Sequence, residues 1–120
     1  MTEPWAPALA RLPAGGAATD RELLHRFAAA ADEAAFAAVV ARHGRLVFAA
    51  CRRALPTRED AEDACQATFL ILARKAGAVR WDRCVGNWLY ATARRVAAKA
   101  HRAAVRRAAR EAAATPPAAA

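Results

Sequence analysis

Four carboxylates gather in the segment after Pro56, and they are the first residues whose type and spacing could do chemistry. They are Glu59, Asp60, Glu62 and Asp63. Clustered carboxylates can serve catalysis, but these follow Thr57 at the start of a predicted helix, where the helix dipole favours anions. Two interpretations stay open: a structural acidic first turn, or a face that meets a partner.

An apolar run downstream favours the partner interpretation. Phe69, Leu70, Ile71 and Leu72 are consecutive, so their side chains point around the whole helix. At least one of them must face outward or meet a partner. The opposite interpretation is a fully buried helix behind its acidic first turn.

Basic and aromatic residues share the C-terminal part of the chain. Five of them recur at helical spacing and form one stripe: Trp88, Arg95, Lys99, Arg102 and Arg106. Tyr90, Arg94 and His101 are predicted to form an adjacent stripe. Cations that follow phosphates and rings that stack on unpaired bases are what single-stranded DNA binding requires. The other interpretation is a solvated arginine face with Trp88 in the core, and for Trp88 the sequence favours neither.

The charge distribution also indicates a polyanionic partner. The chain has 19 Lys and Arg against 11 Asp and Glu, and residues 1–65 carry a net charge of −1 against +9 for residues 66–120. GC-rich codons can produce an Arg- and Ala-rich composition, but they do not explain why the two halves differ.

The sequence lacks the residue patterns that catalytic, cofactor and metal sites require. The sequence contains no Gly-rich phosphate loop and no Ser-His-Asp or Cys-His set, so neither an enzyme nor a cofactor is expected. Cys51, Cys65 and Cys84 form no CxxC pair and are predicted to be reduced and buried, and the histidines lack metal-ligand spacing with them.

We see no signal peptide and no apolar run long enough to span a membrane, which predicts a soluble cytoplasmic protein without a membrane partner.

Helices must position these groups, because 39 of the 120 residues are alanine and β-branched residues are few. Four residues are predicted to cap helices: Thr19, Asp32, Thr57 and Asn87. The third helix should end near Lys75 and the last near Ala112, with a loop over residues 76–86. We therefore predict an all-α fold, a small bundle of about four helices.

The predicted domain covers residues 19–112. Residues 1–18 are rich in Pro, Gly and Ala and are predicted to be a disordered leader. Residues 113–120 are predicted to be a linker-like tail.

The order of these motifs resembles region 2 of bacterial RNA polymerase sigma factors of the extracytoplasmic-function group. The resemblance rests on Asp-Ala-Glu-Asp-x-x-Gln-x-x-Phe-Leu from Asp60 and on Trp-Leu-Tyr-x-x-Ala-Arg from Trp88. It extends upstream through Thr-Asp-Arg-Glu-Leu-Leu from Thr19 and Phe-Ala-Ala-Val-Val-Ala-Arg-His from Phe36, so that it covers roughly residues 19–107. Such sigma factors normally carry a second helical domain, region 4, which has no counterpart in these residues. Either the chain is truncated or region 2 works alone, and the sequence does not choose.

The resemblance implies that the Asp-x-x-Gln helix docks on the clamp helices of core RNA polymerase. The residues carried over to this face are Asp60, Asp63, Gln66, Phe69 and Leu70. Arginines of the clamp would accept the carboxylates as rim pairs, and Phe69 or Leu70 would be the apolar anchor. The family often has Glu where this chain has Ala67, so docking is expected to be weaker or to rely more on Asp63.

The resemblance also implies that the protein recognises and melts the −10 promoter element in transcription initiation, holding the single-stranded non-template strand. The predicted DNA-binding residues are Arg80, Trp81, Arg83, Trp88, Tyr90, Arg94, Arg95, Lys99, Arg102 and Arg106. The loop before the last helix would capture a flipped base, and Trp81 either stacks on that base or fills space under the loop. Many relatives have Asn where Arg95 stands, which leaves the base preference open. An anti-sigma factor is a further candidate partner.

The alternative is a general nucleic-acid-binding protein without promoter specificity. Its basic helix would bind duplex DNA without sequence choice. The acidic face from Asp60 to Gln66 argues against this alternative, because a non-specific DNA binder has no use for it.

Overall fold

The structure of the protein, a computed structural model, describes residues 18–78, Trp81 and residues 84–114. Four helices follow one another: α2 (Asp20–Ala30), α3 (Glu33–Ala54), α4 (Arg58–Lys75) and α5 (Val85–Ala114). No strand occurs within these residues, so the predicted all-α bundle of about four helices is confirmed. The predicted leader, apart from Ala18, and residues 115–120 of the predicted tail lie outside the described residues.

Three of the four predicted helix caps are confirmed. Each side-chain oxygen accepts a hydrogen bond from the backbone N–H three residues on, at 3.0–3.1 Å: Thr19 from Glu22, Asp32 from Ala35, and Thr57 from Asp60. These bonds satisfy backbone donors that have no partner inside the helix.

The cap predicted at Asn87 is wrong. Helix α5 begins at Val85, and its first backbone bond runs from the Trp88 N–H to the Cys84 carbonyl oxygen at 3.2 Å. The helix thus begins three residues earlier than a cap at Asn87 predicts, and the Val85 side chain in its first turn is only 4% exposed. Tertiary packing here outweighs the capping preference of Asn.

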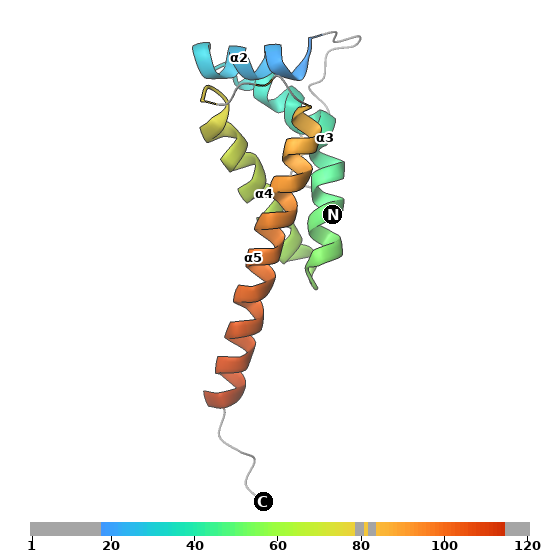
Figure 1. Ribbon diagram of the computed structural model, residues 1–120, viewed down its shortest axis with the longest axis vertical. Coiled ribbons are helices and arrows are strands. Elements are labelled where there is room, and N and C mark those ends of the chain that lie inside the picture. Colours follow the sequence, from blue (N-terminus) through green and yellow to red (C-terminus); the bar gives the residue numbers. More distant parts are fainter. Residues whose placement is uncertain (1–17, 79–80, 82–83, 115–120) are drawn as a thin grey trace, which may run out of the picture.

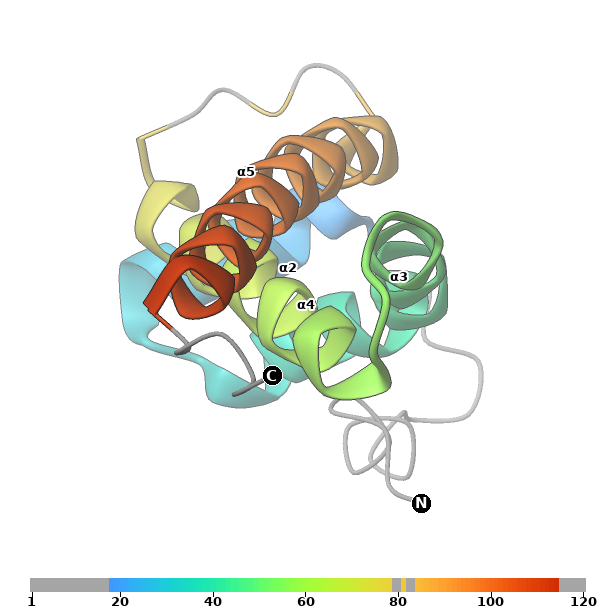
Figure 2. The same cartoon turned by 90° about the horizontal axis from the view of Figure 1, so that it is seen from below.

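The core lies where α3, α4 and α5 pack together, and α2 crosses one end of them (Figures 1 and 2). Every helix contributes to it. The largest side chains with almost no exposed surface are Leu24, Val39, Val47, Cys51, Cys65, Thr68, Leu72 and Leu89. The Thr68 hydroxyl is accommodated in this apolar core because it donates a hydrogen bond to the Ala64 carbonyl oxygen at 2.8 Å.

By length and composition alone, α3 is long and apolar enough to cross a membrane. This differs from the prediction that the chain has no apolar run of that length. Its many alanines make most of the helix apolar, although it has no long run of large apolar side chains. In the structure Val39, Val47 and Cys51 of this helix are fully buried in the bundle. The helix is thus the central core helix of the fold, which has the same apolar composition as a membrane span.

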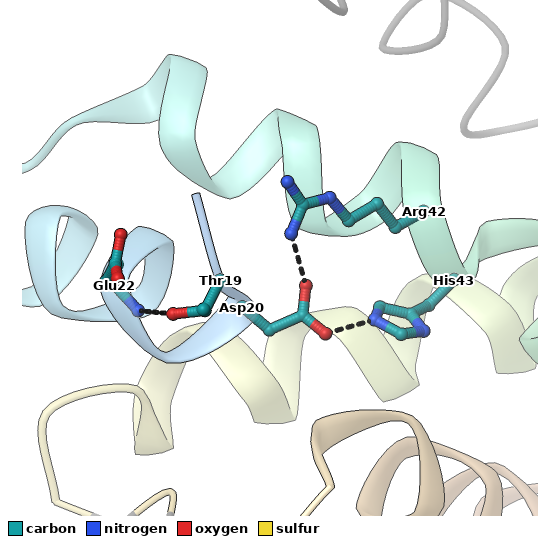
Figure 3. A network of polar contacts seen from close by, with 5 residues as sticks. All are labelled: Thr19, Asp20, Glu22, Arg42 and His43. Carbon is teal, nitrogen blue, oxygen red and sulfur yellow. Dashed lines mark hydrogen bonds and ion pairs between the residues drawn. The ribbon is translucent and has the colours of Figure 1, made fainter. Parts of the chain in front are cut away.

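A polar network holds α2 against α3 (Figure 3). The Asp20 carboxylate accepts a hydrogen bond from Arg42 at 3.1 Å and lies 2.6 Å from Nε2 of His43. On its other side His43 meets the start of α5, where a Cβ added to Gly86 would lie 3.3 Å from the imidazole. Glycine at this position therefore lets α5 approach α3 closely.

Helix α5 extends well past the other helices (Figure 1). Its buried side chains end at Ala97, and every residue from Val105 to Ala114 is exposed. The C-terminal part of α5 is therefore a basic helix surrounded by solvent.

Candidate functional site

The outward face of α4 carries polar groups together with one large apolar side chain. Asp63 and Gln66 are exposed, and Leu70 between them and the end of the helix is 60% exposed. The opposite face is buried and includes Ala61, Ala64, Cys65, Thr68 and Leu72. The expectation that at least one residue of the apolar run faces outward is thus confirmed for Leu70.

Phe69 is placed differently from Leu70. Its side chain is 8% exposed and forms part of an apolar hollow of about 250 Å³ between α3 and α4. The residues that line this hollow are Phe36, Val40, Cys65, Gln66, Phe69, Leu70 and Ala73. Of the two proposed anchors, Leu70 projects from the surface, whereas Phe69 lies in the wall of the hollow beside it.

The carboxylates at the start of α4 differ in their partners. Glu62 pairs with Arg58 at 3.1 Å, and the Arg58 guanidinium also lies over the Phe48 ring of α3, 5.1 Å from its centroid. Asp60 is half-buried, and Asp63 has no ion pair within the part of the chain that the structure describes. Asp63 and Glu59, the two exposed carboxylates of this group, are therefore the ones available to a basic partner.

The basic residues of α5 lie along its exposed face. Arg95, Lys99, Arg102 and Arg106 are all exposed, and Arg95 donates a hydrogen bond to the Thr92 hydroxyl at 3.3 Å. The predicted adjacency of the two stripes is wrong. At 3.6 residues per turn, the two stripes lie at opposite edges of this face. One edge carries Arg95, and the other carries Tyr90, Arg94 and His101. Ala91 and Ala98, both exposed, separate them.

The two tryptophans near the start of α5 pack against each other. Trp81 is 9% exposed, and its Nε1–H donates to the Ala76 carbonyl oxygen at 3.1 Å. Trp88 is half-buried and meets Trp81 edge to face, with ring centroids 5.3 Å apart. Of the two roles left open for Trp81, the structure supports the core role, because a buried ring cannot stack on a DNA base without leaving its pocket. Its assignment as a DNA contact stays a prediction that this burial does not favour.

Two other predicted DNA contacts, Arg80 and Arg83, lie outside the described residues.

The edge of α5 that carries Tyr90 and Arg94 lies beside the C-terminal part of α3. The Arg94 guanidinium lies over the Tyr90 ring, 5.9 Å from its centroid. Arg53 of α3 lines the same hollow as both of them. Sequence reasoning did not select Arg53, because the periodicity of one helix carries no information about its neighbour.

The cysteines are only partly as predicted. All three are free thiols, but Cys84 is exposed, whereas Cys51 and Cys65 are buried. Burial raises the pKa of Cys51 to about 11 and that of Cys65 to about 12, with smaller contributions at Cys65 from nearby Cys51 and Glu62. No group of three or more His, Cys, Asp or Glu side chains in the described residues could hold a metal ion.

The fold is a small all-helical bundle with an exposed acidic and apolar face on one helix and an exposed basic face on another. The chain belongs to the sigma-70 region 2 family, which matches residues 39–107. The matched segment takes in most of α3, all of α4 and the basic part of α5 up to Arg107.

Its curated relatives are sigma factors of the extracytoplasmic-function (ECF) group. The chain is 39% identical over 72 residues to the ECF RNA polymerase sigma factor SigM of Mycobacterium tuberculosis H37Rv, which covers 60% of this chain and 36% of that protein. It is also 39% identical over 61 residues to SigM of the Erdman strain, covering 51% of this chain and 31% of that protein. The alignments thus span about a third of the length of these relatives. A comparison with solved structures gave no significant match.

Proposed function

We propose that this chain acts in the cytoplasm as a sigma-factor region 2 domain that binds core RNA polymerase and the −10 promoter element. The outward face of α4 binds the clamp helices of the polymerase. The exposed face of α5 binds the single-stranded non-template strand. As in other sigma factors, the domain carries out no catalysis of its own.

The observation that carries the polymerase half of this proposal is the exposure of Leu70. Its neighbours Phe69 and Leu72 are buried, whereas Leu70 keeps 60% of its surface in water, directly beside an apolar hollow. Full burial of a leucine side chain stabilises a complex by roughly 1.5–3 kcal/mol, so this residue is a strong candidate anchor. Asp63 and Gln66 then form the polar rim that aligns a basic partner.

The DNA half rests on the charge and exposure of α5. Its arginines and Lys99 are exposed, and acidic residues are absent from Cys84 to Arg110. A row of cations without compensating carboxylates attracts a phosphate backbone, and it makes binding strongly dependent on salt.

Matched leucine substitutions test the polymerase half. Leu46 on α3 is 45% exposed and lies outside the hollow beside α4, so Leu46→Ser removes a similar amount of exposed apolar surface. In a binding titration with core RNA polymerase, Leu70→Ser should weaken the complex by roughly tenfold or more. Leu46→Ser should bind like the wild type. Equal affinity of all three proteins would remove α4 as the docking face.

A DNA titration separates the proposed function from a general nucleic-acid binder, which the exposed basic end of α5 would also suit. The chain should prefer single-stranded DNA to duplex. Contact with about four phosphates predicts a slope near −3 in a plot of log affinity against log salt for single strands. Equal affinity for any duplex would favour the general binder.

A further inference from the structure

An exposed thiol and a half-buried imidazole border the same small space at the start of α5. The position that a Cβ on Gly86 would take lies 3.6 Å from Sγ of Cys84 and 3.4 Å from Nδ1 of His43. Because Gly86 has no side chain, it places nothing between these two atoms. Cys84 comes directly before α5 and His43 belongs to α3, so the fold brings together two groups that are far apart in the sequence.

The imidazole is oriented by the Asp20 carboxylate on its other side (Figure 3). Nε2 of His43 lies 2.6 Å from Oδ2 of Asp20, and Arg42 donates a hydrogen bond to Oδ1 of the same carboxylate at 3.1 Å. A carboxylate only accepts hydrogen bonds, so it holds the proton of the neutral ring on Nε2 and leaves Nδ1 free to accept a proton on the side of Gly86. A thiol, a base and a carboxylate that orients the base thus follow one another, which is the arrangement that activates a nucleophile.

Among the three free thiols, Cys84 is the one that solvent reaches. Cys51 and Cys65 are 0% and 1% exposed, and burial raises their pKa values to about 11 and about 12, so both stay protonated and inaccessible. Cys84 is exposed, so a small molecule in solution can approach its sulfur. Reaction of the folded chain with a disulfide is therefore expected at Cys84, because the thiolate is the form that attacks a disulfide.

We propose that Cys84 is a modification site that exchanges with small disulfides, with His43 as its base and Asp20 as the residue that positions His43. His43 takes the thiol proton on Nδ1, directly or through one water molecule. Sγ of Cys84 then attacks one sulfur of the disulfide and forms a new S–S bond, while the old S–S bond breaks and its electron pair leaves with the other sulfur. The departing sulfur takes the proton from His43. Cys84 is thereby oxidised to a mixed disulfide, and one half of the small disulfide is reduced to a thiol.

The exchange is reversible, because a thiol in solution can attack the mixed disulfide and release Cys84. This chemistry suits a transient redox mark in a reducing compartment, where stable disulfides are rare. The inference goes beyond the proposed function and does not depend on it, since Cys84, His43 and Asp20 belong neither to the outward face of α4 nor to the basic face of α5.

The first measurement compares the full chain with a synthetic peptide of residues 80–88, which carries the same thiol without His43. The probe is dithiodipyridine, a small disulfide that releases a light-absorbing thiol, and mass spectrometry of peptides locates the adduct. At neutral pH an unassisted thiol is only a few per cent ionised, so the folded chain should react at Cys84 roughly tenfold faster than the peptide. A folded chain that reacts no faster than the peptide, or that reacts mainly at Cys51 or Cys65, would overturn the proposal.

Matched histidine variants test the base. His43→Gln keeps an amide that can donate to Asp20 but cannot take the thiol proton, so it should slow the exchange roughly tenfold. His25→Gln makes the same substitution at an exposed histidine of α2 and should react like the wild type. Thermal melting checks that both variants fold, and the peptide comparison needs no variant at all. A folded His43→Gln protein that keeps the wild-type rate would overturn the role of His43.

Variants around the carboxylate test the positioning role of Asp20. Asp20→Asn should slow the exchange, whereas Asp20→Glu keeps a carboxylate and should restore part of the rate. Arg42→Gln breaks the ion pair on the other side of Asp20, so it loosens the same contact between α2 and α3 but leaves the group that faces His43. It should keep the wild-type rate. Equal slowing by Asp20→Asn and Arg42→Gln would mean that Asp20 acts only through the packing of α2, and would overturn its positioning role.

Discussion

The rings of Trp81 and Trp88 pack edge to face, 5.3 Å apart between centroids, with an angle of 89° between the ring planes. This contact joins the segment after α4 to the first turn of α5. The hydrogen bond from Trp81 to the Ala76 carbonyl oxygen fixes the same segment to the end of α4. Together they tie Trp81 to the end of α4 and to the first turn of α5, the helix that carries the basic face.

Removal of this contact should destabilise the fold. Trp81→Ala deletes a ring that is only 9% exposed and should cost about 3–5 kcal/mol of unfolding free energy. In a domain of this size that lowers the melting temperature by more than about 10 °C. Trp81→Phe keeps a ring and should lose far less. If Trp81→Ala instead melted normally and bound DNA poorly, Trp81 would be a stacking residue and not part of the core.

The turn between α2 and α3 offers a stabilising substitution. Ala31 adopts a left-handed conformation with φ 52°, and its N–H bonds to the Phe27 carbonyl oxygen at 2.9 Å. Glycine accepts this conformation without the steric cost that a Cβ imposes, so Ala31→Gly should raise the unfolding free energy by up to about 1 kcal/mol. Ala29→Gly, inside the helix, should lower it by a similar amount. Urea denaturation measures the unfolding free energy of both variants. A destabilised Ala31→Gly protein would contradict the left-handed conformation of Ala31.

The Asp20 network predicts how α2 is held. Asp20→Asn keeps the shape of the side chain but removes the charge that faces Arg42 and His43, so it should cost about 1 kcal/mol of unfolding free energy. Glu22→Gln removes a charge from an exposed neighbour in the same helical turn and should change stability less. The measurement is again urea denaturation. Equal effects would mean that only the charge near the helix N-terminus matters.

The buried thiols predict a loss of stability at alkaline pH. Because burial raises the pKa of Cys51 to about 11 and that of Cys65 to about 12, the folded protein holds both protons where the unfolded chain, with its ordinary value of 9.0, releases them. Their contribution is complete below pH 9 and is lost as the pH rises through the folded values. Urea denaturation should therefore show a decline above pH 9 that is smaller in a Cys51→Val, Cys65→Val variant. An identical decline in both proteins would assign it to other groups.

Local signals in the sequence predicted most of the fold. Thr19, Asp32 and Thr57 are predictable as caps because a cap acts within three residues of its own position. The start of α5 predicted from Asn87 is wrong, because the helix begins at Val85 and the burial of Val85 depends on other helices. Propensity describes a residue's local preference, and packing can outweigh it.

The surfaces were less predictable than the helices for the same reason. Spacing showed that some residue of the apolar run must face outward, but only the packed structure distinguishes exposed Leu70 from buried Phe69. Likewise, Arg53 joins Tyr90 and Arg94 only because α3 and α5 lie side by side. A pattern along one helix cannot predict such a contact.

The most direct test of the central claim is a binding titration of the full chain with core RNA polymerase. It compares the wild type with Asp63→Arg, which reverses an exposed charge on the outward face of α4, and with Glu22→Arg, which reverses an exposed charge on α2. We predict that Asp63→Arg weakens binding about tenfold or more, through repulsion of basic clamp residues, while Glu22→Arg binds like the wild type and all three proteins keep their helical content. Unchanged binding of Asp63→Arg, or no binding by the wild type, would contradict the account.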